Sequence, residues 1–128
     1  MELREISKWT PKVTNEWEIQ FNELYDIEPV SVALFTDQED TQLIWEQFFS
    51  QDLLQIRNVK RGLLLDVGWY PHADSSGSYF LKLLPLVDRS PLWDKPSYVF
   101  ESKYFSILAK EIHQIIGENA MGSGKAPG

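Results

Sequence analysis

The clearest pattern of apolar and polar positions lies at residues 62–87. Apolar side chains recur at every second position in two runs, which are separated by the polar segment 71–77. Alternation with a period of two is typical of a half-buried strand, and two such runs around a loop predict a β-hairpin. One face of this hairpin collects Leu63, Leu65, Val67, Trp69, Tyr79, Leu81 and Leu83. We therefore expect one wholly apolar face.

A turn centred near Asp74 also predicts the register of this hairpin. It places four pairs opposite one another: Asp66 and Lys82, Gly68 and Phe80, Val67 and Leu81, and Trp69 and Tyr79. Cross-strand neighbours of opposite charge, and an aromatic ring over a glycine, are favourable pairs. A slip of one residue reverses the two faces and breaks all four matches together. Asp66 is the single acid within a strongly apolar strand, and its expected partner Lys82 explains it without an active site.

Other segments predict the remaining elements. Residues 30–35, rich in β-branched side chains, predict a strand, and residues 97–101 predict a third strand near the hairpin. Helical spacing predicts helices at residues 37–50 and 103–116. The first of these helices begins with a capping box at Thr36-Asp37-Gln38-Glu39 and buries Leu43, Ile44, Phe48 and Phe49. The second buries Leu108, Ile112, Ile115 and Ile116, with Gly117 expected as a left-handed cap.

Residues 16–25 fit two structures. The helical spacing is formed by Trp17, Phe21, Leu24 and Tyr25. Trp17, Ile19 and Phe21 also alternate with polar residues, as in a half-buried strand. We favour the helix slightly and keep both interpretations open.

These elements predict an α+β fold, in which an antiparallel sheet built around a central hairpin carries helices packed on one face. A chain of 128 residues with 43% hydrophobic residues is expected to form a single globular domain over residues 1–118. Residues 119–128 are expected to be a flexible tail. The absence of cysteine, of an apolar secretory leader and of a membrane-length apolar run predicts a cytoplasmic protein that does not enter membranes.

Acidic residues are concentrated at the start of the chain. Within the first 52 residues there are 12 Asp or Glu but only 3 basic residues, Arg4, Lys8 and Lys12, whereas the remainder holds 7 acids and 9 bases. A formal net charge of -7 disfavours nucleic-acid binding, because the phosphate backbone repels it. An acidic surface instead attracts a basic protein partner.

No catalytic, cofactor or metal motif stands out. The tail sequence Gly122-Ser-Gly-Lys125 lacks the first glycine and the following hydroxyl of a phosphate-binding loop, and no helix follows it. His72 and Asp74 share a loop, but two ligands are too few for a catalytic zinc. His113 is expected to be structural, and Trp93, in a proline-rich connection, is a candidate interface anchor. We therefore expect a binding protein with no cofactor rather than an enzyme.

A family resemblance agrees with this expectation. The stretch Leu63-Leu-Leu-Asp-Val-Gly-Trp-Tyr-Pro71, the loop His72-Ala-Asp-Ser-Ser-Gly77, the strand Tyr79-Phe-Leu-Lys-Leu-Leu84 and the closing Phe100-Glu-Ser-Lys103 with its helix resemble small immunity proteins of bacterial polymorphic-toxin and contact-dependent growth inhibition systems. The resemblance covers roughly residues 62–117 and implies a cytoplasmic protein that neutralises one cognate toxin domain, often a nuclease.

The charge pattern and the resemblance together predict the residues that contact this toxin. Asp37, Glu39 and Asp40 are expected to meet Lys and Arg of a basic toxin domain, and Tyr70, His72 and Asp74 to contribute from the hairpin loop. Two alternatives remain. A small acidic adaptor or subunit that binds a non-toxin protein would have the same charge pattern, and an enzyme would require a cleft around His72 or a carboxylate.

Overall fold

The computed structural model describes residues 6–14, 16–34 and 38–120, apart from the side chains of residues 38–40 and 118–120. Its elements follow the chain in the order β1 (Glu18–Asn22), η2 (Pro29–Leu34), α1 (Gln38–Phe48), β2 (Leu54–Asn58), β3 (Leu63–Tyr70), β4 (Ser78–Val87), β5 (Ser90–Pro91), β6 (Tyr98–Ser102) and α2 (Phe105–Ala120). η2 is a short 3-10 helix. No helix in the described ranges is long and apolar enough to cross a membrane.

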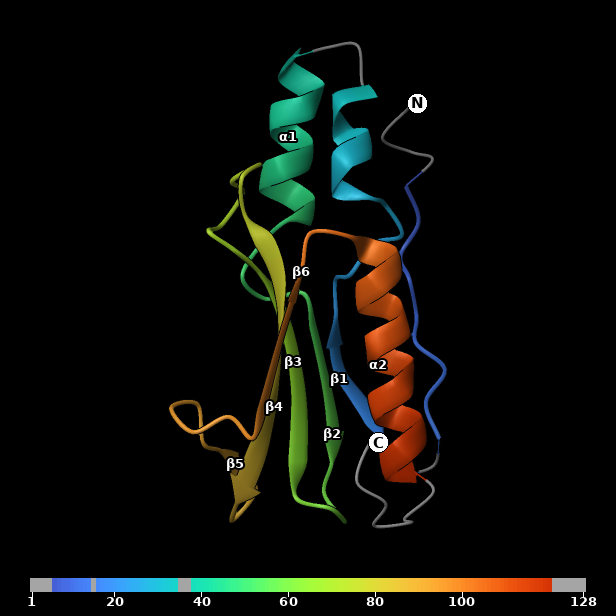
Figure 1. Cartoon of the computed structure of the whole chain (residues 1–128), viewed down its shortest axis with the longest axis vertical. Coiled ribbons are helices and arrows are strands. Elements are labelled where there is room, and N and C mark those ends of the chain that lie inside the picture. The colour runs from blue at the N-terminus through green and yellow to red at the C-terminus, as the bar shows by residue number, and fades with distance from the viewer. Residues whose placement is uncertain (1–5, 15, 35–37, 121–128) are drawn as a thin grey trace.

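The strands form one antiparallel six-stranded sheet within the described part of the chain. Neighbours run in the order β1, β2, β3 and β4, and β4 then pairs with both β5 and β6. Helix α2 covers one face of the sheet, while η2 and α1 stand beyond one end of it (Figure 1). The predicted α+β fold with an antiparallel sheet is confirmed, and α2 is the helix that packs along the sheet face.

The hairpin register is the most detailed prediction that the structure confirms. β3 and β4 pair with Asp66 opposite Lys82, Gly68 opposite Phe80, Val67 opposite Leu81 and Trp69 opposite Tyr79. Strand β6 then continues the sheet, because Phe100 lies opposite Leu81 on the far side of β4. This strand was predicted one residue earlier, at residues 97–101.

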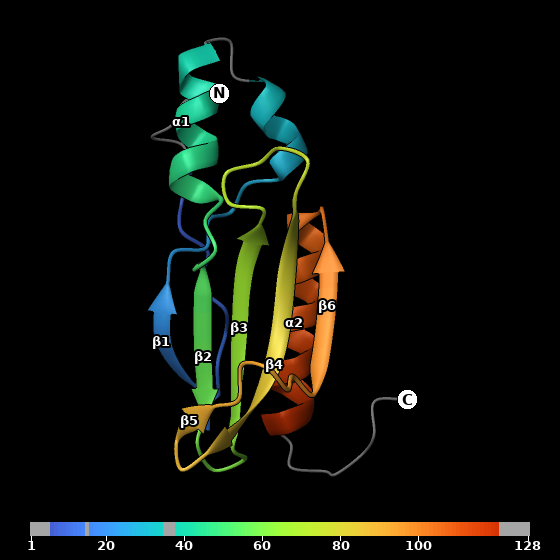
Figure 2. The same cartoon turned by 90° about the vertical axis from the view of Figure 1, so that its left-hand side faces the viewer.

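The core lies between the sheet and α2. The predicted apolar face of the hairpin and the predicted stripe of α2 enter one buried cluster, which contains Leu65, Val67, Trp69, Tyr79, Leu81, Leu108, Ile112, Ile115 and Ile116. Each fully buried side chain of this size contributes about 1.5–3 kcal/mol relative to an exposed one. The other face of the sheet is covered at the end far from α1 by the connection that contains β5 (Figures 1 and 2). On that face Leu64 and Leu84 are buried outside the main cluster.

The segment 16–25 contains the edge strand β1 at Glu18–Asn22 rather than a helix, so the slight preference for helix was wrong. β1 pairs with β2 and contains an irregularity between Ile19 and Phe21. The deciding factor is a partner that the sequence pattern did not predict. β2 offers its free side to this segment, and tertiary pairing outweighs the weak helical spacing.

The predicted strand at residues 30–35 is also wrong, because this segment forms η2. Pro29 and Val32 are buried, three residues apart, whereas Val30 is 72% exposed. A strand would have buried every second side chain. The Ser31 amide and hydroxyl both donate to the Glu28 carbonyl oxygen, at 2.9 and 2.7 Å, which closes the first turn. Phe35 lies outside the described residues.

Helix α1 was predicted at residues 37–50 and lies within those bounds. Ile44 and Phe49 are fully buried as expected, Phe48 is half-buried, and Leu43 is exposed. Two members of the predicted capping box, Thr36 and Asp37, lie outside the described residues.

Helix α2 is longer than predicted. Gly117 lies inside the helix, which continues to Ala120, so the predicted left-handed cap at Gly117 is wrong. The buried Ile115 and Ile116 hold the last turns against the core. Residues 121–128 of the predicted tail lie outside the described residues.

The first turn of α2 is capped by a residue distant in sequence. Glu28 accepts hydrogen bonds from the amides of Phe105 and Ser106, at 2.7 and 2.9 Å. A carboxylate at this position satisfies free amides and complements the positive end of the helix dipole. This contact joins η2 to α2 and could not be derived from local sequence.

Gly68 has a packing role that gives a direct test of the hairpin. A Cβ at residue 68 would lie 2.0 Å from the Gln51 carbonyl oxygen, whereas a Cβ at Gly117 would meet nothing within 4 Å. We expect Gly68→Ala to lower the free energy of unfolding by about 1–3 kcal/mol or more, because backbone atoms must move. Gly117→Ala should raise it by about 0.5–1 kcal/mol, because alanine favours a helix interior. Urea unfolding of both variants measures the contrast, and equal stability of Gly68→Ala and the parent would contradict it.

Candidate functional site

The turn between β3 and β4 lies against the end of α1. The Ala73 amide donates to the Phe49 carbonyl oxygen at 2.8 Å, and the Trp69 amide donates to the Ser50 carbonyl oxygen at 2.8 Å. Figure 2 shows this turn at the end of the sheet where α1 stands. The structure therefore brings the 71–77 turn, which carries His72 and Asp74, beside the C-terminal end of α1, whose first turn contains Glu39 and Asp40.

A groove opens between η2, α1, the 71–77 turn and the start of α2. Its larger cavity, of about 470 Å³, is lined by Pro29, Val30, Val32, Ala33, Thr41, Trp45, Trp69, Ser75, Gly77, Lys103 and Tyr104. An adjoining cavity of about 280 Å³ shares Thr41, Trp45 and Ser75 and adds Gln42, Glu46 and Ala73. We call the two together the turn groove. Its mostly apolar lining with a few polar groups is typical of a binding site.

The turn groove was not predicted from the sequence. The groove depends on η2, and the β-branched side chains of residues 30–35 led to the wrong prediction of a strand there. The sequence did contain one signal for a helix at this segment. Proline is favoured at a first helical position, and Pro29 is followed three residues later by the apolar Val32. Exposed Val30 and Tyr104 lie at its opening, so an apolar surface remains accessible there.

Asp74 has a structural task within the turn. Its carboxylate accepts hydrogen bonds from the Ser76 amide at 2.8 Å and from the Ser76 hydroxyl at 2.6 Å. These bonds lower the pKa of the Asp74 carboxyl. Its carbonyl oxygen also accepts a hydrogen bond from the Trp69 indole nitrogen at 2.8 Å. Asp74 therefore holds the turn in shape and attaches it to the core, in addition to any contact with a partner.

Neither histidine is part of a metal cluster. Within the described residues, no group of three His, Cys, Asp or Glu side chains could hold a metal ion. His72 is exposed in the turn, where a partner can reach it. His113 accepts a hydrogen bond from the Lys12 amide at 3.3 Å, and its ring lies 5.2 Å from that of Trp9. This arrangement agrees with the structural role expected for His113.

Tyr70 lies on the face of the sheet opposite α2. Its ring contacts Phe80 edge to face at 5.8 Å, and the Lys82 ammonium lies 5.8 Å from the ring centroid. Burial raises the pKa of the Tyr70 phenol, and the negative charges of Asp66 and Asp52 raise it further. Tyr70 is half-buried, so it offers only part of its ring to a partner.

Asp66 lies beside Tyr70 and is 4% exposed. Its carboxylate accepts a hydrogen bond from the Gln55 side-chain amide at 3.1 Å. Burial raises the pKa of the Asp66 carboxyl, whereas the Gln55 hydrogen bond and the positive charge of Lys82 oppose this rise. Lys82 is the neighbour that the sequence predicted for Asp66. The hydrogen bond, however, comes from Gln55, a residue of β2, and this strand was not predicted.

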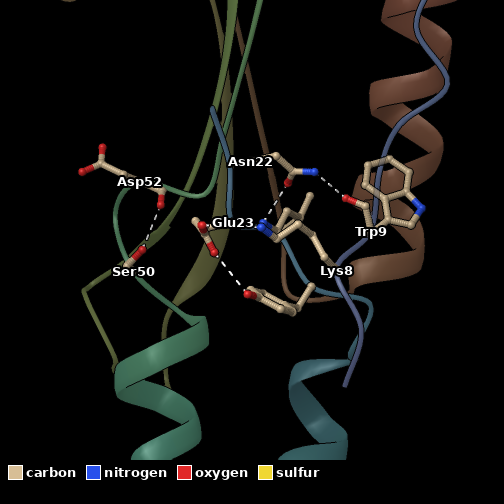
Figure 3. Close-up of polar contacts among 8 residues, drawn as sticks. Lys8, Trp9, Asn22, Glu23, Ser50 and Asp52 are labelled. Atoms are coloured by element: carbon tan, nitrogen blue, oxygen red, sulfur yellow. Dashed lines mark hydrogen bonds and ion pairs between the residues drawn. The ribbon is translucent and has the colours of Figure 1, made fainter. Parts of the chain in front are cut away.

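The acidic residues of the N-terminal part divide into two groups. Glu16 pairs with Lys60 at 3.2 Å, Glu23 pairs with Lys8 at 3.5 Å, and Glu28 caps α2. Figure 3 shows Glu23 among Lys8 and Asn22 at the end of β1, while the Asp52 carboxylate points away from them. Glu18, Asp26, Glu46 and Asp52 are exposed and form no ion pair within the described residues.

The structure describes only part of the three acidic residues that were expected to contact the toxin. Glu39 and Asp40 belong to the first turn of α1, but their side chains, like Asp37 as a whole, lie outside the described residues. The predicted anchor Trp93 is exposed in the connection between β5 and β6, away from the turn groove. Among the acids of α1, Glu46 lines the turn groove together with Ala73 and Ser75 of the turn, whereas Trp93 is not one of the lining residues.

Comparison of the chain with protein-family models, with curated proteins and with solved structures found no match.

Asp66 and Asp74 should affect stability with opposite dependence on pH. The pKa of Asp66 is raised in the folded protein, so its ionisation opposes folding as pH rises above its ordinary value of 3.8. Asp66→Asn keeps an acceptor for Gln55 and should raise the urea midpoint at pH 7, with the gain lost near pH 3. The pKa of Asp74 is lowered, so its ionised form stabilises the fold above the ordinary value and this is lost on acidification. Asp74→Asn should therefore lower the midpoint at pH 7, and shifts of the same sign in both variants would contradict the assignment.

Proposed function

We propose that this protein is a cytoplasmic immunity protein that binds a cognate toxin domain and neutralises it without performing catalysis. The partner is a basic domain, of the kind that a nuclease uses to hold nucleic acid. The binding surface is the end of the molecule formed by α1, η2 and the 71–77 turn. The observation that carries the proposal is the mostly apolar turn groove, which Thr41, Trp45 and Glu46 line from α1, the helix whose first turn contains Glu39 and Asp40.

The charge distribution supports a basic partner. The first 52 residues contain 12 acids and 3 bases, and only some of these acids are used in ion pairs or helix capping within the described residues. Glu46 lines the turn groove, and Glu39 and Asp40 begin the same helix. Opposite charge across an interface speeds encounter and selects among partners more than it deepens affinity.

The turn groove supports a protein partner. Protein interfaces derive most of their affinity from a few aromatic or apolar anchors in a desolvated centre, with charged groups at the rim. Trp45 and Tyr104 contribute aromatic surface to the groove, and Glu46 contributes a charge beside it. A toxin side chain with an apolar stem and a cationic end, such as Arg, fits both parts.

The resemblance of residues 62–117 to immunity proteins supplies the partner class. The alternative, a small acidic adaptor or subunit of another protein, shares the charge pattern and the groove. The immunity-protein and adaptor hypotheses differ in the identity of the protein that binds. In immunity systems of this kind the toxin gene directly precedes the immunity gene, so the C-terminal domain encoded immediately upstream is the partner to test.

The deciding experiment is co-expression of that upstream domain with the full chain. Neutralisation requires that the domain kill cells or cleave its substrate alone and lose this activity when the chain is added in equal amount. A domain that binds the chain but keeps its activity would favour the adaptor. An upstream gene with no toxic product would refute the proposal.

Neutralising the acids of α1 should slow binding. Glu39→Gln/Asp40→Asn removes two negative charges, and we expect about 3- to 10-fold slower association with the upstream domain at low salt, with a smaller difference at high salt. Asp88→Asn/Asp94→Asn removes the same charge from exposed residues around β5 and is the matched control. Stopped-flow association rates measure both. Equal slowing in the two variants would show that only net charge matters.

A charge at the opening of the groove should weaken binding without unfolding the protein. Val30 lines the groove and is 72% exposed, so Val30→Lys should change the free energy of unfolding by no more than about 0.5 kcal/mol. We expect it to raise the Kd for the upstream domain at least about tenfold, because the added positive charge repels a basic partner and must be desolvated. Val87→Lys, at a residue 52% exposed in β4, is the control. Calorimetric titration measures both, and unchanged affinity of Val30→Lys would exclude the groove.

A further inference from the structure

The larger cavity of the turn groove carries a positive charge that has no acidic partner. Lys103 is the only charged residue among the described residues that line it, because Glu46 lines only the adjoining cavity. The Lys103 ammonium donates to the Ser76 carbonyl oxygen at 3.4 Å and forms no ion pair within the described residues. An acidic protein thus has a cavity whose one described charge is positive.

The acid that begins this wall of the cavity is already engaged. Glu28 directly precedes Pro29, and its two carboxylate oxygens accept hydrogen bonds from the Phe105 and Ser106 amides at 2.7 and 2.9 Å. Both views of the molecule show η2 directly beyond the start of α2, where these bonds are formed (Figures 1 and 2). Glu28 therefore caps α2, and the charge of Lys103 is left for a ligand.

The rest of the cavity offers apolar and aromatic surface. The Trp69 indole nitrogen donates to the Asp74 carbonyl oxygen at 2.8 Å, so its ring presents no free donor to the cavity. The Trp45 ring lies beside it, with the two centroids 5.6 Å apart. The wall on the η2 side is formed by Pro29, Val30, Val32 and Ala33. An apolar body with a negative end matches these walls and Lys103 together.

We infer that the larger cavity binds a small aromatic or aliphatic carboxylate as a free molecule. Its volume of about 470 Å³ falls within the range of roughly 300–1,000 Å³ that is typical of small-molecule sites. The apolar body of the ligand lies against Trp45 and Trp69, and its carboxylate meets the Lys103 ammonium. Ser75 and Tyr104 add hydroxyl groups to the same lining. This inference is independent of the toxin and goes beyond the proposed function.

The net charge of the protein makes the response to ligand charge diagnostic. A chain with a formal net charge of -7 attracts cations and repels anions at long range. A preference for a carboxylate over an ammonium of similar shape therefore requires a local positive charge. Lys103 is exposed, so its pairing with a carboxylate is weak, and we expect about 2- to 5-fold tighter binding than for a neutral analogue. Burial of the apolar body supplies most of the affinity.

The test uses three probes that share an indole ring and differ in charge. Indoleacetate is the carboxylate, indoleacetamide is the neutral analogue and tryptamine is the cation. Nuclear magnetic resonance titration of the isotope-labelled full chain gives a Kd for each probe and identifies the signals that move. We expect indoleacetate to bind most tightly and tryptamine least tightly, with the largest shifts at the Trp45 and Trp69 indoles and at Gly77.

Two variants separate the charge from the cavity. Lys103→Gln should remove the preference for indoleacetate over indoleacetamide and leave the Kd of indoleacetamide unchanged. Lys95→Gln removes the same charge from an exposed residue between β5 and β6 that does not line the cavity, and is the matched control. Ala33→Phe fills space at an exposed lining residue and should raise the Kd of both probes at least about tenfold. The spectrum of each variant reports whether it is folded.

Three results would overturn the inference. Tryptamine might bind as tightly as indoleacetate, Lys103→Gln and Lys95→Gln might weaken indoleacetate equally, or millimolar probe might leave the signals of the lining residues unmoved. Each would show that Lys103 and the cavity do not form a carboxylate site. None of these measurements involves the toxin, so failure here is distinguishable from failure of the proposed function.

Discussion

The pairing of β3 with β4 is the contact on which the rest of the molecule depends, because it sets the position of Trp69. In this register Trp69 lies opposite Tyr79, and their rings meet edge to face at 5.0 Å. Phe49 contacts both rings, at 4.9 and 6.2 Å, and so joins the end of α1 to the hairpin. A register shifted by one residue would turn Trp69 away from the core and remove the surface on which α1 and α2 pack.

The candidate binding surface follows from two further constraints. Gly68 has no Cβ, so the backbone at Gln51 approaches the hairpin closely and holds the end of α1 beside the turn. Glu28 joins η2 to the start of α2 by accepting two amide hydrogen bonds. The turn groove lies between the parts held by these contacts. Its walls are therefore joined to one another by backbone and side-chain hydrogen bonds, and walls that keep their positions would lose less entropy when a partner binds.

The end of the molecule with α1 combines charge and apolar surface in one place. Glu46 lines the mostly apolar turn groove, and Glu39 and Asp40 belong to the first turn of the same helix. For a basic protein partner, opposite charge would speed encounter, whereas burial of the apolar lining would supply most of the affinity.

The sequence by itself determined the elements whose local pattern is unambiguous. The hairpin register, α1, β6 and the buried stripe of α2 follow from residue spacing, because a period of two or of 3.6 is fixed by backbone geometry. Tertiary structure alone decided the rest. Strand β1 forms because β2 is available to pair with it. The helix η2 forms because its turn buries Pro29 and Val32 together. The first turn of α2 is capped by Glu28, which is far away in sequence. The turn groove is bounded by four segments that are far apart in sequence: η2, α1, the 71–77 turn and residues 103–104. A surface made by distant segments has no local pattern from which it can be predicted.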